Sequence, residues 1–232
     1  NELMPKIDNT NSYFSGEKLY GDDLELNEIN EWFEDEKLGY YNLGAGVTKS
    51  YQYKYHALNY EYGYRYLKDV QFSNVLGIGS AYGDELIPIS KNCSEITILE
   101  PTDKFSKNTL NGTPVSYAKS NSSGEIPFAD DHFDLITCFG VLHHIPNVSK
   151  VITEIHRCLT SGGHALIREP NHSMGDWRKS RNGLTKRERG IPPDIFTKII
   201  NFHKTIFEIN FVKKLCRQNH IDSKNAHALS VL

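Results

Sequence analysis

Hydrophobic and polar positions change their pattern near residue 72. Before it, apolar residues such as Ile29, Trp32 and Phe33 recur at helical spacing, which predicts an amphipathic helix over 22–36. The stretch 54–69 predicts a second helix, although Gly63 weakens it and alternating tyrosines leave a strand open. The first 70 residues are therefore expected to form a helical cap.

From residue 72 onward, short apolar runs alternate with helical patterns. Helices are expected over 84–90 and over 146–159, where Gly162 and Gly163 end the second. This alternation indicates an α/β fold, a Rossmann-like, doubly wound and mostly parallel sheet with helices on both faces, over 71–232. The runs predict strands at 72–78, 95–100, 114–118, 133–140 and 164–169.

The carboxyl-terminal part is harder to interpret. Residues 194–203 predict a helix, and residues 205–212 fit a strand as well as a helix. A final antiparallel strand is not evident in 217–232. An oligomer partner supplying this edge is one explanation, so a homodimer is a candidate assembly.

Composition narrows the class of protein. The chain has 232 residues, 38% hydrophobic and 24% charged, with a net charge of −3, which is a globular mixture and does not mark a nucleic-acid binder. No apolar run approaches a membrane span, and the first residues do not read as a signal peptide. The four cysteines form no CxxC pair, so reduced thiols in a cytoplasmic protein are expected.

Candidate chemistry lies at the carboxyl ends of the predicted strands, where open α/β sheets bind ligands. The sequence VLGIGSAYGDE (75–85) places glycines in a strand-to-helix turn, where the backbone can approach a ligand closely. Glu100 ends the next strand, and a carboxylate there can accept two hydrogen bonds from a ribose diol. Together these features predict a nucleoside-containing cofactor.

Two further segments, IPFADDHFDLITCFGVLHHIPN (126–147) and EIHRCLTSGGHALIRE (154–169), carry a family resemblance. With the glycine turn, they make residues 72–170 resemble class I S-adenosylmethionine-dependent methyltransferases of the small-molecule branch. The resemblance implies S-adenosylmethionine as cofactor and S-adenosylhomocysteine as product. Carried over residue by residue, it implies cofactor contacts at Gly77, Gly79, Ser80, Ala81, Tyr82, Gly83, Glu100, Pro101, Ser122, Phe139 and Gly140.

The chain departs from the family pattern at several positions. Gly77 replaces the usual acid of the first motif, and Ala81 replaces its central glycine. SGG replaces PGG at 161–163, and Ser122 is nearest to the acid expected to contact adenine. Asp84 and Glu85 are candidates for a displaced carboxylate. A non-catalytic relative that keeps the fold is therefore an alternative.

Methyl transfer is an in-line displacement, so positioning is the main task of the protein. A hydroxyl acceptor would also need a general base, and His143 and His144 are the candidates. Adjacent residues are expected to point different ways, so one would face the site and the other would pack. The alternative is a pair that only orders the loop. No spacing requires a metal, and none is expected.

The substrate is expected to contact the basic segment 168–193 and the tyrosine-rich segment near 55. The first would act as a lid that binds an anionic substrate, or would be a solvated surface. Its sequence EPNHSMGDWRKSRNGLTKRERGIP (169–192) also resembles methyltransferases of bacterial surface-polysaccharide synthesis, which implies O-methylation of a glycan precursor. Candidate substrate-binding residues are Tyr55, His56, Arg65, Glu169, His172, Trp177, Arg178 and Arg181.

The expected acceptor is thus a sugar, a nucleotide-sugar or a phosphorylated metabolite. An NAD-dependent oxidoreductase would use the same glycine turn but would not need the HHIP and SGG segments. A nucleic-acid methyltransferase would use the basic segment, but the acidic amino-terminal part argues against it.

Overall fold

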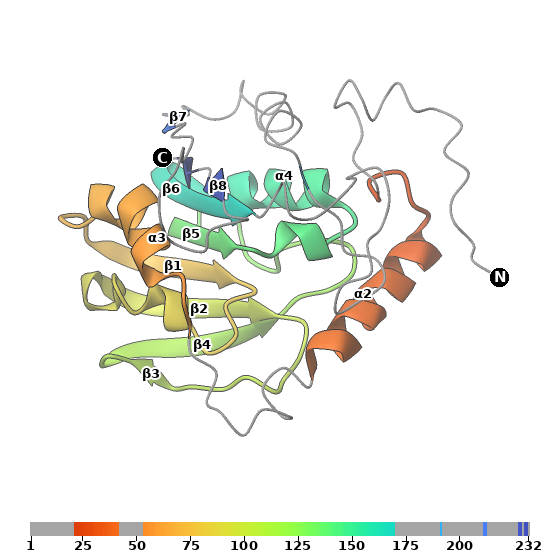
Figure 1. The fold of residues 1–232 in the computed structure, drawn as a ribbon, viewed down its shortest axis with the longest axis horizontal. Coiled ribbons are helices and arrows are strands. Elements are labelled where there is room, and N and C mark those ends of the chain that lie inside the picture. Colours follow the sequence, from red (N-terminus) through yellow and green to blue (C-terminus); the bar gives the residue numbers. More distant parts are fainter. Residues whose placement is uncertain are drawn as a thin grey trace.

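The computed structural model describes residues 21–41, 53–169 and 191, together with the backbone of 211–212, 227–228 and 230–231. Figure 1 shows a central sheet with α3 and α4 beside it and α2 along one end. The helices are α2 (Leu26–Tyr41), α3 (His56–Tyr62) and α4 (Val148–Cys158). The strands are β1 (Phe72–Ile78), β2 (Cys93–Glu100), β3 (Thr109–Leu110), β4 (Thr113–Lys119), β5 (Phe133–Phe139), β6 (Leu159–Glu169), β7 (Phe211–Val212), β8 (His227–Ala228) and β9 (Ser230–Val231).

The main sheet has the strand order β3-β4-β2-β1-β5-β6-β8. The five strands from β4 to β6 are parallel, and β3 and β8 join the two edges antiparallel. The chain moves from β1 towards β4 and then returns to β5 on the other side of β1. The expected doubly wound α/β sheet is therefore confirmed, and the switch in strand order lies between β1 and β5.

Alternation along the central strands creates two cores, one on each face of the sheet. On one face, Leu76 and Ile78 of β1 pack with Ile152 and Ile155 of α4. On the other, Val75 packs with residues that follow α3 and β1, including Tyr64 and Leu86. Because both faces are covered, the central strands read as continuous apolar runs, which is why their positions were predictable.

Two expectations about the connections were wrong. Residues 84–90 form no α-helix but the 3-10 turns Asp84–Leu86 and Ser90–Asn92, with Pro88, which lacks a backbone N–H, between them. The glycine pair at 162–163 does not end a helix, because α4 already ends at Cys158. It lies inside β6, where the pairing with β5 is irregular between Leu159 and His164.

The amino-terminal helices contact the sheet at two places. Helix α2 lies along the carboxyl ends of the strands (Figure 1), where Asn30 accepts a hydrogen bond from Ser122. Upstream of α2, Asp22 accepts a hydrogen bond from Ser149 at the start of α4. Helix α3, which ends before Gly63 as that residue suggested, packs near Leu166 of β6. Both helices predicted in this part are present.

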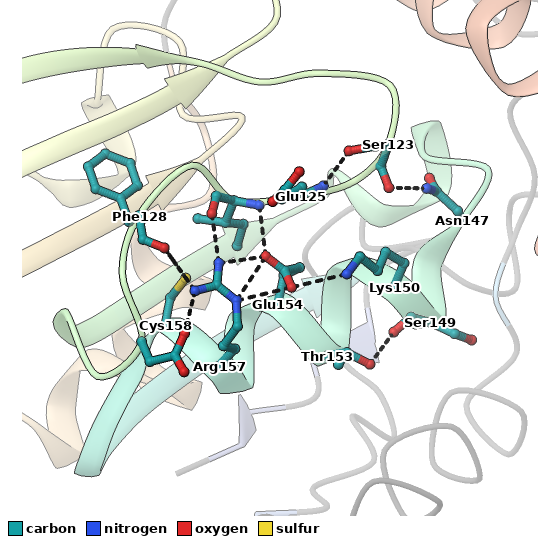
Figure 2. Close-up of polar contacts among 12 residues, drawn as sticks. Ser123, Glu125, Phe128, Asn147, Ser149, Lys150, Thr153, Glu154, Arg157 and Cys158 are labelled. Atoms are coloured by element: carbon teal, nitrogen blue, oxygen red, sulfur yellow. Dashed lines mark hydrogen bonds and ion pairs between the residues drawn. The ribbon is translucent and has the colours of Figure 1, made fainter. Parts of the chain in front are cut away.

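An ion-pair network fixes α4 to the segment before β5 (Figure 2). Glu154 is 3% exposed and lies 2.7 Å from Arg157 Nη2. Arg157 also donates to the carbonyls of Ile126 and Phe128. Hydrogen bonds from Arg157 are the main cause that lowers the pKa of Glu154 to about 2. The network holds the loop that precedes β5 and thereby the start of that strand.

The carboxyl-terminal strands that sequence reasoning did not find are short. Strand β8 lies antiparallel to β6, with Ala228 opposite Arg168, and β9 pairs with β7. The helix predicted over 194–203 lies outside the described residues, as does Cys216. Within residues 21–41 and 53–169, no helix is both long and apolar enough to span a membrane.

Candidate functional site

The glycine turn leaves β1 in a left-handed conformation. Gly79, Ala81 and Gly83 have φ values of 64°, 50° and 75°. Two constraints favour glycine at position 79. Its φ is positive, and a Cβ there would lie only 2.6 Å from Val141 Cγ2. Its N–H donates to the carbonyl of Leu99 at 2.9 Å, which joins the turn to the end of β2. Ala81 holds a conformation that is uncommon for a residue with a side chain.

Glu100 supports this conformation. Its carboxylate Oε1 accepts the backbone N–H of Ala81 at 2.5 Å, while the residue is only 6% exposed. Burial raises its pKa to about 7, and the Ala81 hydrogen bond opposes that rise. The acid at the end of β2 and the turn after β1 therefore meet at one point of the sheet edge, as their positions in the sequence suggested.

The other residues with an expected cofactor contact surround this point. Ser80 is buried, and half-buried Pro101 follows Glu100. Tyr82, at the rim, packs edge-on against Phe105. Ser122 donates to Asn30 of α2, so the position that lacks the family acid is paired with an amide from the amino-terminal helix.

The end of β5 brings Phe139 and Gly140 beside Arg168, which lies opposite Phe139 in β6. The Arg168 guanidinium carbon lies 5.6 Å from the Phe139 ring centroid and 4.6 Å from that of Tyr55. Its Nε donates to Asn59 Oδ1 at 2.9 Å. Gly140 has a φ of 73°, and a Cβ there would meet Arg168 Nη2 at 3.9 Å, an ordinary van der Waals distance.

The two histidines lie in the 3-10 turn Leu142–His144, directly after β5. Their rings are 3.8 Å apart, so the expectation that they point different ways was wrong. Adjacent residues of a 3-10 turn leave the backbone about 120° apart, so the contact comes from the two rings tilting toward each other, with an interplanar angle of 45°. His143 contacts Glu169 at the end of β6, whereas His144 contacts Glu36 and Tyr40 of α2, at 3.1 and 3.3 Å.

Glu169 binds the whole loop after β5. It accepts the backbone N–H groups of Val141 and Leu142, both at 2.8 Å, and the Nδ1–H of His143 at 2.8 Å. The hydrogen bond and charge of His143, with these backbone groups, lower the pKa of Glu169 despite its burial. An ionised Glu169 can only accept, so Nδ1 carries a proton and Nε2 is the basic nitrogen of the neutral ring.

The predicted substrate residues separate into three groups. Tyr55 covers Arg168, and His56 packs against Tyr53 at 4.9 Å. Arg65 is instead engaged with Glu61 and Tyr66. The remaining candidates His172, Trp177, Arg178 and Arg181 lie outside the described residues.

Sequence reasoning counted Tyr53 only as one of the clustered tyrosines and Arg168 only as one of the basic residues of segment 168–193, and it gave no role to Asn59. Tyr53 accepts a hydrogen bond from Asn59 at 2.7 Å, and Arg168 Nη2 lies 3.4 Å from its hydroxyl. Only the contact between α3 and β6 brings these residues together, and the sequence carried no signal for it. In the part of the chain that the structure describes, no cluster of three or more metal-ligating side chains occurs.

Comparison with known protein families assigns most of the sheet to a known domain. Residues 76–167 match the family model described as a methyltransferase domain, from β1 into β6. Residues 76–167 therefore form a methyltransferase domain of the class I S-adenosylmethionine-dependent type. The matched residues include the glycine turn, Glu100 and the histidine pair. Arg168 and Glu169 follow directly after this methyltransferase domain, and α2, α3 and the residues just before α3 precede it.

Two relatives of the domain are named as methyltransferases of quinone biosynthesis. A C-methyltransferase UbiE of ubiquinone and menaquinone biosynthesis from Psychromonas ingrahamii is 40% identical over 55 residues, which are 24% of this chain and 22% of that protein. A demethylmenaquinone methyltransferase from Bacteroides fragilis is 26% identical over 167 residues, 66% of this chain and 64% of that protein. The chain thus spans less than two thirds of either relative.

Solved structures share the fold of this methyltransferase domain. The N-methyltransferase NodS from Bradyrhizobium japonicum, in complex with S-adenosylhomocysteine, has a TM-score of 0.56 and 15% identity, covering 83% of this chain and 97% of that one. The [4+2]-cyclase SpnF has a TM-score of 0.57 and 15% identity, covering 80% and 72%. Since these neighbours differ in activity, the fold alone does not fix the reaction.

Proposed function

We propose that this protein is an S-adenosylmethionine-dependent methyltransferase that acts on a small molecule carrying an ionisable hydroxyl. The observation that carries the proposal is the contact between Glu100 and the Ala81 N–H within the matched methyltransferase domain. It places one carboxylate oxygen against the turn and leaves the other as an acceptor for a ribose hydroxyl.

The local geometry is compatible with the cofactor. The left-handed turn has no side chains at Gly79 and Gly83, where a nucleoside would pass, and Gly140 likewise carries none directly after Phe139. Glu100 would hold the ribose, and Ser122 with Asn30 would flank the adenine end. The bound cofactor would supply an electrophilic methyl group. The contribution of this chain is then to orient the acceptor and to remove its proton.

His143 is the proposed base. With its Nδ1–H held by Glu169, the neutral ring presents Nε2 as the proton acceptor, and the nearby carboxylate stabilises the imidazolium that forms. His144 interacts with α2 through Glu36 and Tyr40, which suits a positioning role for that helix. Both a sugar hydroxyl and a phenolic ring would need such a base.

The acceptor itself has two candidate sources. The resemblance of residues 169–192 favours O-methylation of a surface-glycan precursor, whereas the named relatives favour a quinone ring. The comparisons lend no specific support to the glycan. Both acceptors carry a hydroxyl that a base could deprotonate. In the glycan the resulting oxygen would take the methyl group, whereas in the quinol the charge would reach a ring carbon that takes the methyl group and then loses its own proton. Methyl-transfer assays with demethylmenaquinol analogues beside sugar nucleotides would separate the two candidates.

The test of the function is calorimetric titration with S-adenosylhomocysteine beside NADH. Micromolar binding of the first alone, abolished or strongly weakened in Glu100→Gln, is the expected result. Binding of NADH alone would contradict the proposal in favour of an oxidoreductase. Tight binding of S-adenosylhomocysteine with no transfer to either acceptor class would favour a non-catalytic relative.

A further inference from the structure

Four ionisable side chains form a row that connects the end of β6 to α2. Glu169 contacts Nδ1 of His143 at 2.8 Å, and the ring of His143 lies 3.8 Å from the ring of His144, measured between centroids. On its other side, Nδ1 of His144 lies 3.1 Å from Oε2 of Glu36. Each histidine therefore faces one carboxylate, and the two rings face each other.

The two rings are too close for both to carry a charge near neutral pH. Like charges within about 4–6 Å disfavour each other's charged form, and the burial of His143 leaves little water to screen the repulsion. Two ionisable groups that interact this strongly take up protons as a pair, in two separated steps. Between these steps the pair holds a single positive charge, and the surrounding acceptors decide which ring carries it.

Glu36 depends on that charge more than Glu169 does. The carboxylate of Glu169 accepts the backbone N–H groups of Val141 and Leu142, which offset its charge without a cation. Glu36 is 8% exposed and lies inside α2, where the backbone N–H groups are engaged in the helix. A buried carboxylate is costly unless a cation or hydrogen-bond donors meet it, and the ring of His144 faces it at ion-pair distance.

The surroundings of His144 suit the charged ring. An imidazolium is a hydrogen-bond donor at both nitrogens. Glu36 faces Nδ1, and the hydroxyl of Tyr40, one turn further along α2, lies 3.3 Å from Nε2. Because a hydroxyl can accept as well as donate, Tyr40 can take the second N–H. His143 contacts Glu169 through Nδ1, and its neutral tautomer already satisfies that contact.

We infer that Glu36 and His144 are positioning residues that hold the positive charge of the pair away from His143 and so keep its Nε2 free to accept a proton. On the proposed function, on which this inference rests, the base is then available only while α2 contacts the histidine turn. Without that contact the charge would pass to His143, which faces Glu169, and the proton acceptor would already be occupied.

The charges balance over one turnover. The proton of the acceptor hydroxyl goes to Nε2 of His143, and the positive charge that it brings replaces the one that the cofactor loses with its methyl group. Repulsion from His144 then favours release of this proton to water, which restores the neutral ring.

The groups that face the two rings come from β5, β6 and α2. Glu169 ends β6, Glu36 and Tyr40 belong to α2, and Cys138 of β5 interacts electrostatically with Glu169. Burial raises the pKa of the Cys138 thiol well above its ordinary range, so the thiol stays neutral. Glu169 and Glu36 are therefore the charges that compete for the proton of the pair.

Glu36→Gln tests the inference, with Glu34→Gln as the matched control. Both substitutions remove one acid from α2, but Glu34 is exposed and pairs with Lys37. We expect the rising limb of the pH profile of kcat to move about one pH unit to higher pH in Glu36→Gln, because the charge then passes to His143. Glu34→Gln should leave the profile unchanged.

A purely structural role of these residues would give a different result. Looser packing of α2 alone would raise KM in Glu36→Gln without moving the limb, and that result would overturn the inference. His144→Asn removes the neighbouring charge itself, so it should move the limb in the same direction as Glu36→Gln does. A limb that stays in place in His144→Asn would equally contradict the charge coupling.

The ring charges of the unliganded protein give a second measurement that needs no acceptor. Imidazole nitrogen chemical shifts in NMR distinguish a charged ring from each neutral tautomer. At pH 7 we expect a charged His144 and a neutral His143 with its proton on Nδ1 in the wild type, and the reverse charges in Glu36→Gln. Identical ring charges in the two proteins would overturn the inference even if methyl transfer is found. The expected charges without any methyl transfer would overturn the proposed function alone.

Discussion

Glu169 and His143 are joined at 2.8 Å across the loop that follows β5. The same carboxylate accepts the backbone N–H groups at 141 and 142, so one residue fixes both the path of the loop and the tautomer of the ring. For Nε2 of His143 to act as a base, the loop must hold the ring in place and the proton of the neutral ring must sit on Nδ1. Glu169 was predicted to bind substrate, and its hydrogen bonds suit a positioning residue instead.

Replacing Glu169 by glutamine should lower kcat at least about tenfold, because the ring loses the partner that stabilises its charged form. The affinity for S-adenosylhomocysteine should change little, since Glu100 and the turn are untouched. The measurement is the pH profile of kcat, whose rising limb should move to lower pH in the variant, because an imidazolium without its facing carboxylate loses its proton more easily. An unchanged profile with an unchanged kcat would contradict the positioning role.

His143 and His144 can be separated by parallel substitution with asparagine. His143→Asn should reduce kcat by about 100-fold or more, which is the range for loss of a general base. His144→Asn should mainly raise KM, because it loosens the contact with Glu36 and Tyr40 and so the position of α2. Steady-state kinetics of the two variants give kcat and KM for each. A large loss of kcat in His144→Asn with little change in His143→Asn would assign the base to His144.

The fold could be predicted well from sequence where burial dictates the pattern. The run 72–78 coincides with β1 because both of its faces are buried and the next residues must turn. The segment 84–90 could not be placed, because its apolar residues fit a helix while Pro88 and the preceding turn impose 3-10 geometry. Short antiparallel strands such as β8 depend on a distant partner in β6, and local pattern does not encode that.

The sequence also predicted the part of the site that lies at strand ends, but not the part that depends on α3. Glu100 and the glycine turn each end a strand, so the parallel sheet alone brings them together. Arg168 also ends a strand, but its role depends on Tyr55 and Asn59, which come from α3. That helix joins the sheet through tertiary packing at more than 100 residues of sequence separation. The local pattern of hydrophobic and polar residues in a single sequence does not predict contacts between such distant segments.

Arg157→Met should lower the free energy of unfolding by about 3 kcal/mol, because it leaves Glu154 buried without its main partner. The depressed pKa of Glu154 adds a pH dependence: its stabilising effect is present above the unfolded value of 4.5 and is lost as pH falls towards 2. Urea unfolding at pH 7 and pH 3 measures both. Equal stability of variant and wild type at pH 7 would show that this network is dispensable.

Glu85 should have the opposite pH dependence. Its pKa is raised from 4.5 to about 8, so the folded state favours the protonated form, and stability falls as pH rises through that window. Glu85→Gln should therefore be near neutral at pH 5 and more stable than the wild type by a few kcal/mol at pH 9. Denaturant unfolding of the unliganded protein at the two pH values measures the difference.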